Sequence, residues 1–379
     1  MFARTTSQSV EGHPKMAAHV RAPAPRVAAG RRLLAPAALA ACLAIGWPAA
    51  AARADVFGSG TNQFTMDFVT VGNPGNADDS GTTGLYSTAY GGVAYSYRIG
   101  TYEVSRQMIT AANNLGALGI TLQDMSLYGN AMDGSDPATG LNWREAARFV
   151  NWLNTSKGFT PAYNFTQQPG DFGYDARSNN IVLWQAGDAG YDADNPYRNA
   201  NAGYFLPSED EWYKAAFYSG SGSLYYDYPT GSDTTPTGVN SGTTANTAVF
   251  GRSTNTGPAA VTTAGGVSHY GTMGQGGNAA EWLESAADGT NNSATEDRTL
   301  RGGAWLNPES TLRSSYHLGQ PITGETFIMG LRVVASVPEP SAGMLVLTAA
   351  VMPLVCLWRR SARPGRRWRT DAPPEPAGC

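Results

Sequence analysis

A paired-glycine motif constrains the fold of this chain more than any other stretch. It reads LRGGAW from Leu300 to Trp305, and a short apolar stretch with the sequence MGLRV follows at 329–333. Paired glycines let a backbone adopt a positive φ or approach another backbone closely. We therefore expect a strand, a bend at Gly302 and Gly303, a buried Trp305, and a closing strand over 329–333.

Two arginines follow the bend. Arg313 and Arg332 are expected to anchor carboxylates or carbonyl groups, because a guanidinium forms two parallel hydrogen bonds with such partners. The motif is weak evidence by itself, since similar pieces occur in many β-rich proteins. It gains weight from three other stretches that precede it in a fixed order.

The composition indicates loop-rich, β-containing structure. Of 379 residues, 45 are glycine and only 15% are charged, against about 25% charged residues in typical domains. The net charge of −4 conceals an acidic centre, because residues 55–335 hold 13 basic and 26 acidic side chains. A nucleic-acid partner requires a basic surface, so this composition argues against one. This acidic centre is compatible with bound cations or simply with solubility.

Residues 1–54 have the features of an N-terminal extension and a secretory signal peptide. Arg31 and Arg32 precede an apolar run over 33–52, and an A-x-A cleavage site ends at Ala54. We expect cleavage before Asp55. The stretch ahead of Arg31 is long for such a signal. This length favours a start codon at Met16 or later, with a cytoplasmic arm as the alternative.

Residues 336–379 combine a short motif, an apolar run and a basic tail. Pro338, Glu339 and Pro340 lead into apolar residues 342–358, and Arg359 and Arg360 follow. A run of this length is at the lower limit for a membrane span, and the arginines favour a cytoplasmic C-terminus. The arrangement resembles the PEP-CTERM sorting signal of Gram-negative bacteria. This resemblance implies cleavage by an exosortase-type enzyme and an association with extracellular polysaccharide, while the long tail leaves permanent membrane anchoring open.

The positions of the cysteines exclude several kinds of site. Cys42 lies in the signal, Cys356 in the apolar run, and Cys379 ends the chain. The domain at 55–335 therefore has no cysteine for a disulfide, a thiolate metal site or a nucleophile. It must be stable through its hydrophobic core, for which about 280 residues suffice.

Local patterns predict the first regular elements. Apolar and polar residues alternate over 64–71 and over 93–99, which predicts two strands. Ser105 is the expected N-cap of a helix over 106–115.

Two capping boxes predict further helices. Asn142 with Glu145 begins the clearest helix, which runs to Leu153 with one apolar face. Ser208 with Glu211 begins another, and the acidic residues at 209–211 suit a helix N-terminus. An acid/base role for these carboxylates is the alternative interpretation.

Two loop regions complete the central domain. Residues 220–266 have little periodicity and are expected to wrap the surface, held at Val239–Asn240 and Val249–Phe250, before a short helix or strand at 276–282. A strand is also expected at Ile181–Trp184. Asp188, Asp192 and Asp194 suggest a calcium loop, but the EF-hand spacing and its closing Glu are missing.

Four stretches in a fixed order carry a family resemblance. They read YRIGTYEVS, YFLPSEDEW, GGNAAEW, and LRGGAW with GLR. Together they resemble the sulfatase-modifying-factor family, which includes formylglycine-generating enzymes, the sulfoxide synthases of ergothioneine biosynthesis and many non-catalytic relatives. The resemblance covers nearly all of 55–335. It implies a C-type-lectin-like, formylglycine-generating-enzyme-like α+β fold with small twisted sheets, few helices and much irregular backbone. The residues of its structural motif are Arg301, Gly302, Gly303, Trp305, Arg313, Gly330 and Arg332.

The resemblance also implies which catalytic groups to look for. Formylglycine-generating enzymes bind copper through two cysteines placed shortly after the glycine pair. Asn307 and Leu312 stand at about these positions here. Neither supplies a thiolate, so copper is not expected and no catalytic residue is assigned.

Iron and calcium are the remaining metals that the resemblance raises. The sulfoxide synthases bind iron through three histidines, whereas this domain has only His269 and His317, so only a site of two histidines and a carboxylate stays open. Asn278 and Glu281 match a Gly-Asn-x-x-Glu-Trp motif whose oxygens bind a structural calcium in the family. Oxygen ligands suit this hard cation. The alternative is a turn in which Asn278 caps backbone groups.

These observations lead to two main hypotheses for function. The first is an exported binding module at the cell surface or in the extracellular matrix, with polysaccharide or a matrix protein as its partner. Its recognition face would comprise residues 220–266 and the loops near Trp305. The second is a divergent formylglycine-generating-like or non-haem metal oxidoreductase. A structural matrix protein without a specific ligand is a third possibility.

Overall fold

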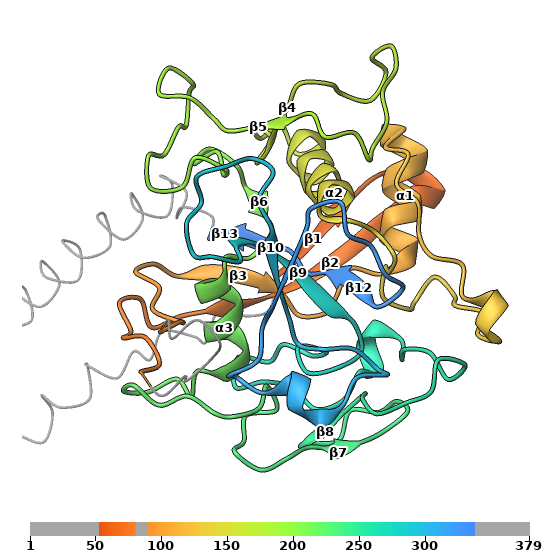
Figure 1. Cartoon of the computed structure of the whole chain (residues 1–379), viewed down its shortest axis with the longest axis vertical. Coiled ribbons are helices and arrows are strands. Elements are labelled where there is room, and N and C mark those ends of the chain that lie inside the picture. Colours follow the sequence, from red (N-terminus) through yellow and green to blue (C-terminus); the bar gives the residue numbers. More distant parts are fainter. Residues whose placement is uncertain (1–52, 81–88, 338–379) are drawn as a thin grey trace, which may run out of the picture. The chain divides into compact units, whose positions relative to one another are not determined.

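The computed structural model describes residues 53–80 and 89–337. In this part of the chain, thirteen short strands and three α-helices are linked by much irregular backbone (Figure 1). The helices are α1 (Arg106–Gly116), α2 (Trp143–Ser156) and α3 (Glu209–Phe217). Single-turn 3₁₀ helices lie at Gly60–Asn62, Ser126–Tyr128, Val261–Thr263 and Glu309–Leu312. The expected α+β architecture with few helices is confirmed.

The largest sheet has five strands in the order β1-β2-β3-β13-β6, all antiparallel. Its core face follows from alternation, because Phe64, Met66 and Phe68 of β2 are buried while the residues between them are exposed. The bounds are β1 (Arg53–Phe57), β2 (Phe64–Val71), β3 (Tyr97–Gly100), β6 (Tyr204–Phe205) and β13 (Val334–Ser336).

The second sheet carries the paired-glycine motif. Its order is β11-β10-β9-β12, and β12 pairs with β9 in parallel. The bounds are β9 (Ala280–Ala286), β10 (Arg298–Arg301), β11 (Leu318–Gln320) and β12 (Met329–Leu331). Two smaller pairs are β4 (Asn164–Phe165) with β5 (Ile181–Val182), and β7 (Thr237–Gly238) with β8 (Thr247–Ala248).

The helices begin where their capping residues predict. The Ser105 hydroxyl accepts a bond from the backbone N–H of Met108 at 3.4 Å. Complete capping boxes begin α2, through Asn142 and Glu145, and α3, through Ser208 and Glu211. Each box satisfies backbone N–H groups that have no partner within the helix, which is why these short motifs fix the helix start.

The predicted strand over 93–99 is wrong in its first half. β3 begins only at Tyr97. The Val93 carbonyl accepts the Gly75 N–H at 2.8 Å, and the Val93 N–H donates to the Asn76 side chain at 3.3 Å. These bonds to the loop at 75–76 take the place of a strand ladder. The strand expected at Ile181–Trp184 is likewise shorter, because only Ile181 and Val182 pair.

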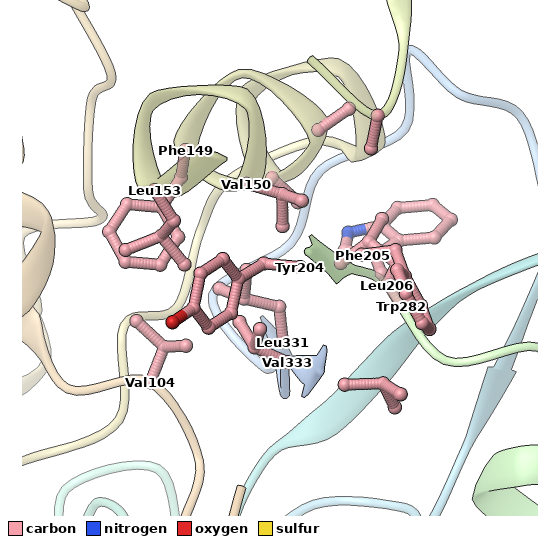
Figure 2. Close-up of a cluster of buried hydrophobic side chains, with 14 of the residues drawn as sticks. Val104, Phe149, Val150, Leu153, Tyr204, Phe205, Leu206, Trp282, Leu331 and Val333 are labelled. Atoms are coloured by element: carbon pink, nitrogen blue, oxygen red, sulfur yellow. The ribbon is translucent and has the colours of Figure 1, made fainter. Parts of the chain in front are cut away.

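The main core lies between α2 and the five-stranded sheet. Figure 2 shows Phe149, Val150 and Leu153 of α2 directed towards Tyr204 and Val333. All of these side chains are at most 5% exposed, so the apolar stripe of α2 is core, as its helical spacing predicts.

The long loop at 220–266 forms one region with β7 and β8 (Figure 1). Val249 is completely buried and Val239 packs beside it, so the expected attachment points are confirmed. Beyond this loop, 280–286 is a strand rather than a helix.

Several expectations concern residues at or beyond the edges of the described ranges. β1 already begins at Arg53, two residues ahead of the expected domain start. The signal-peptide run and the sorting-signal residues Pro338, Glu339, Pro340, Arg359 and Arg360 lie outside the described residues. Within 53–80 and 89–337, no helix has the length and apolar character needed to cross a membrane.

Candidate functional site

The bend at Gly302 and Gly303 has the geometry that the sequence predicts. The two residues have φ values of +90° and +67°. A Cβ atom on Gly302 would lie 2.7 Å from the Gln275 carbonyl oxygen, and one on Gly303 would lie 2.2 Å from the Thr311 hydroxyl oxygen. Both reasons for glycine therefore hold at once, a left-handed backbone and a close approach.

Trp305 fills the space behind this bend. Its side chain is completely buried in a cluster with Met125, Val249 and Ala259. Its backbone N–H donates to the Asn278 carbonyl at 3.1 Å. The tryptophan therefore joins the paired-glycine motif to the third stretch of the family resemblance.

Arg332 is the anchor that its guanidinium chemistry predicts. It forms a salt bridge of 2.6 Å with Glu281, and both side chains are completely buried. It also donates to the carbonyls of Gly100, at 2.8 Å, and Met273, at 2.7 Å. The second oxygen of Glu281 accepts the indole N–H of Trp212 at 2.6 Å. One buried ion pair thus connects β9, β3 and α3.

Arg301 anchors a second buried group. Its guanidinium contacts Glu209 at 2.6 Å and donates to the carbonyls of Ser314 and Tyr316. His317 Nδ1 lies 2.9 Å from the same carboxylate oxygen of Glu209. Burial alone would raise the pKa of Glu209, but Arg301 and His317 outweigh this effect and hold it below its usual value.

Arg313 contacts a carboxylate, as expected, but does so at the surface. Its side chain is 44% exposed and pairs with Glu309 at 2.8 Å, four residues earlier. The guanidinium lies over the Tyr228 ring, 5.2 Å from its centroid. Because Arg313 follows the single turn at 309–312, it points to the surface and forms an exposed pair rather than a buried anchor.

The sequence reasoning missed Glu103, which lies beside the centre of the motif network. Its carboxylate is buried and accepts bonds from the Asn278 side chain at 2.5 Å and from the Ala279 N–H at 2.9 Å. Burial first, and then the charge of Glu281, raises its pKa to about 8. Its position within the YRIGTYEVS stretch, between Tyr102 and Val104, was the available signal.

The residues expected to bind calcium do not fit a cation site. Asn278 has a φ of +59°, and its side-chain oxygen accepts the Ala259 N–H at 2.8 Å. Both oxygens of Glu281 are bonded to Arg332 or Trp212. Neither side chain offers a free oxygen, so the alternative interpretation of Asn278 as a capping residue describes it better. Calcium binding by this protein stays a prediction.

The aspartates at 188–194 form turns instead of a calcium loop. Asp188 accepts the Gln185 N–H at 2.7 Å, and Asp192 accepts the Asp194 N–H at 3.0 Å. Across the described ranges, no group of three or more His, Cys, Asp or Glu side chains is placed to hold a metal.

The two histidines do not form the metal site that the oxidoreductase hypothesis needs. His317 is buried beside Glu209, whereas His269 stacks edge-on against Tyr270 at 5.3 Å and touches the turn at Gly220. His317 lies in the core because it pairs with Glu209, which also binds Arg301. Its ring completes an ion-pair network in the core rather than a set of metal ligands.

The positions matched to the copper-binding cysteines hold structural side chains. The Asn307 side-chain oxygen accepts the Ala304 N–H at 2.9 Å and so closes the turn after the bend. Leu312 is 1% exposed and packs with Tyr228 and Ala248. An amide and an apolar side chain do not fit a copper ion, which prefers thiolate or imidazole ligands.

A small cavity lies next to the motif. Its volume is about 70 Å³, whereas small-molecule sites typically enclose about 300–1,000 Å³. It is lined by Ala280, Leu300, Arg301, Gly303, Asn307, Tyr316, Leu318, Ile328 and Met329. The motif therefore builds a packed centre with little room for an organic ligand.

Comparison with known protein families identifies this arrangement. Residues 94–337 match the model of the FGE-sulfatase family, described as the sulfatase-modifying factor enzyme 1-like domain. The chain belongs to this family. The match contains all four stretches that carried the resemblance. It also contains the buried Glu103, Glu281 and Arg332.

Of three solved structures similar to this chain, one has a TM-score above 0.5. Treponema denticola variable protein 1 matches with a TM-score of 0.51 and 21% identity, covering 75% of this chain and 99% of that one. CarF gives a TM-score of 0.47 at 18% identity, and the match covers 72% of this chain and 99% of CarF. PvdO from Pseudomonas aeruginosa gives a TM-score of 0.45 at 15% identity, and the match covers 75% of this chain and 98% of PvdO. No curated protein matches the sequence. The expected C-type-lectin-like α+β fold is confirmed, and the likeness extends to fold alone.

Proposed function

We propose that this protein is an exported, non-catalytic member of the family that binds a component of the extracellular polysaccharide matrix. The observation that carries the proposal is the packing of Leu312. At the place where the resemblance puts a copper-binding thiolate, an apolar side chain is buried against Tyr228 and Ala248. A thiolate site needs a deprotonated sulfur in a polar or positively charged setting. The surroundings of Leu312 are buried and apolar, so they would disfavour a thiolate.

The bonding of the other motif residues supports the same conclusion. Arg332 with Glu281 and Arg301 with Glu209 are buried ion pairs. Groups held in this way orient the sheets rather than contact a ligand. The domain at 55–335 also contains no cysteine at all, so no alternative thiol pair is present there.

The proposed location rests on the two ends of the sequence. A signal peptide would take the chain across the inner membrane of a Gram-negative bacterium. The PEP-CTERM-like end would deliver it to an exosortase-type enzyme, with the apolar run at 342–358 as a membrane anchor before processing. At the surface, residues 220–266 and the loops near Trp305 are the proposed recognition face for polysaccharide or a matrix protein. The acidic central domain excludes nucleic acid from this proposal.

Two measurements on the purified full chain test the proposal, and a third tests calcium binding. Co-sedimentation with insoluble extracellular polysaccharide from the producing cells should retain the protein. Elemental analysis should find neither copper nor iron at stoichiometric level. Thermal melting with and without a chelator, on the same sample, would show whether calcium stabilises the fold.

The outcomes separate the two function classes. Stoichiometric copper or iron together with oxygen consumption would establish an oxidoreductase and overturn the proposal. Absence of binding to the polysaccharide would leave a structural matrix protein. Bound calcium with a lower melting temperature after chelation would support a structural ion outside the Asn278–Glu281 pair.

A further inference from the structure

We infer that a cavity between α1, α2 and the segment 161–169 binds a neutral sugar ring of a polysaccharide. This inference rests on the proposed function and adds a second sugar site, apart from the recognition face proposed at 220–266 and near Trp305. The cavity has a volume of about 340 Å³, which lies within the usual range of about 300–1,000 Å³ for ligand sites. No residue of the paired-glycine motif lines it. Helices α1 and α2, which both contribute lining residues, lie side by side in Figure 1.

Trp152 gives the cavity a fixed aromatic wall. Its ring stacks on Phe64 at 6.0 Å and on Phe149 at 6.4 Å. Its edge rests on Gly116, where an added Cβ would lie 2.5 Å from the indole. The side chain is nevertheless only partly buried. No hydrogen-bond partner of its indole N–H is found in the described part of the chain, and a free indole N–H at a concave site normally finds one.

Arg148 is the one charged residue among those lining the cavity, and its guanidinium is hydrogen-bonded to the protein. Its guanidinium donates to the carbonyls of Ala176 and Gln167, both at 3.1 Å, and to the side chain of Asn180 at 2.7 Å. Its faces are covered by the rings of Phe165 and Tyr174, 4.0 and 4.8 Å from the respective centroids. Arg148 therefore stiffens the wall and its hydrogen bonds are directed at the protein.

The remaining polar atoms are mainly acceptors. The hydroxyls of Thr155 and Ser156 donate to helix carbonyls, at 3.2 and 2.8 Å, so their oxygen lone pairs are left for a ligand. The side-chain nitrogen of Gln168 donates to the Phe165 carbonyl at 2.8 Å. Its side-chain oxygen is left to accept a hydrogen bond from a ligand. The lining therefore offers mainly acceptors, together with the indole N–H of Trp152, and its one charge is already bonded to the protein. Such a lining favours a ligand that donates several hydrogen bonds and also accepts one. A sugar ring does so through its hydroxyls, whereas a carboxylate or phosphate only accepts.

An exposed aromatic residue follows Gln168 and Pro169 of the cavity wall along the chain. Phe172 is fully exposed in the loop that also carries Gln168. The loop is held by reciprocal bonds between Gln168 and Asp171, at 2.7 and 3.0 Å, and by the Tyr174 hydroxyl, which donates to the Leu118 carbonyl at 2.8 Å. A single exposed apolar side chain is common on protein surfaces, so the role of Phe172 is part of the proposal. Its flat ring provides a second platform for an adjacent sugar unit.

The test is calorimetric titration of the full chain with cellotetraose and maltotetraose as neutral probes, and with an oligogalacturonate as the acidic probe. Trp152→Phe keeps the ring stacking but removes the indole N–H, and Thr155→Val removes an acceptor. Phe172→Ala removes the second platform. The matched control is Leu224→Ala, because Leu224 is also an exposed apolar residue, at 66%, in a different loop.

Binding of a neutral probe, weakened about threefold to tenfold by each cavity variant and unchanged in Leu224→Ala, would support the inference. Equal melting temperatures would show that the variants are folded. Binding of the acidic probe alone, or neutral binding that ignores all three variants, would overturn it. If polysaccharide still retains the chain in either of these cases, the proposed function stands and only this site is wrong. If neither polysaccharide nor any probe binds, both fail.

Discussion

Arg332 and Glu281 form a salt bridge of 2.6 Å in which neither side chain is exposed at all. Glu281 lies on β9 of the four-stranded sheet, while Arg332 also donates to the carbonyl of Gly100 at the end of β3. The pair therefore connects the two main sheets. Both charges are removed from water, so each depends on the other for its stabilisation.

Removing one partner should be strongly destabilising. Arg332→Met leaves the Glu281 carboxylate buried without its counter-charge, which we expect to cost about 3–5 kcal/mol of unfolding free energy. Urea denaturation measures this cost. The control is Arg313→Ala, whose ion pair is 44% exposed and should contribute about 0–1 kcal/mol. Equal effects of the two substitutions would contradict this account.

The stability of the protein should fall as the pH rises through the neutral range. Burial raises the pKa of Glu103 from 4.5 to about 8. Because the folded pKa lies above the unfolded value, its contribution is complete below pH 4.5 and is lost as the pH approaches 8. Glu103→Gln mimics the protonated acid. The difference in unfolding free energy between Glu103→Gln and wild type should therefore grow in favour of the variant from pH 4.5 to about pH 8 and stay constant above that. Urea denaturation at a series of pH values measures it.

Asp210 provides an internal comparison for that experiment. Burial raises the pKa of Asp210 from 3.8 to about 6, so the advantage of Asp210→Asn over wild type should level off near pH 6. A difference for Glu103→Gln that does not change with pH would show that Glu103 titrates normally.

Leu312 should behave as a core residue. Leu312→Ala is expected to cost about 2–5 kcal/mol, because it opens a cavity next to Tyr228 and Ala248. Leu318→Ala is the matched control, since Leu318 is 42% exposed and should change stability by about 0.5 kcal/mol or less. Chemical denaturation compares the two. A small effect at Leu312 would remove the main support for a non-catalytic centre.

The bend should tolerate no side chain at Gly303. Gly303→Ala meets both a φ of +67° and a contact of 2.2 Å with the Thr311 hydroxyl oxygen. Gly289→Ala is the control, because Gly289 has a similar φ of +78° but open space around it. The control should cost about 1–2 kcal/mol for the left-handed backbone, and Gly303→Ala about 1–3 kcal/mol more for the overlap. Similar melting temperatures would mean that Thr311 moves freely.

The helix starts and the glycine bend were predictable from the sequence because interactions between neighbouring residues determine them. Asn142 with Glu145 and Ser208 with Glu211 satisfy the first N–H groups of their own helices. The glycine pair likewise determines its bend through backbone freedom that only glycine has. The strand at 93–99 was predicted too long, because bonds to the distant loop at 75–76 determine where its ladder begins.

The partners of the charged residues were decided by the tertiary structure alone. The sequence showed that Arg332 would anchor something, but Glu281 is 51 residues away, and Glu103 meets Asn278 across 175 residues. His317 joins Glu209 instead of His269 for the same reason. A charge inside a protein pairs with whichever group the folded backbone brings within hydrogen-bond distance. Residue types therefore determined which chemical groups were present, and only the packing of the sheets decided which of these groups contact one another.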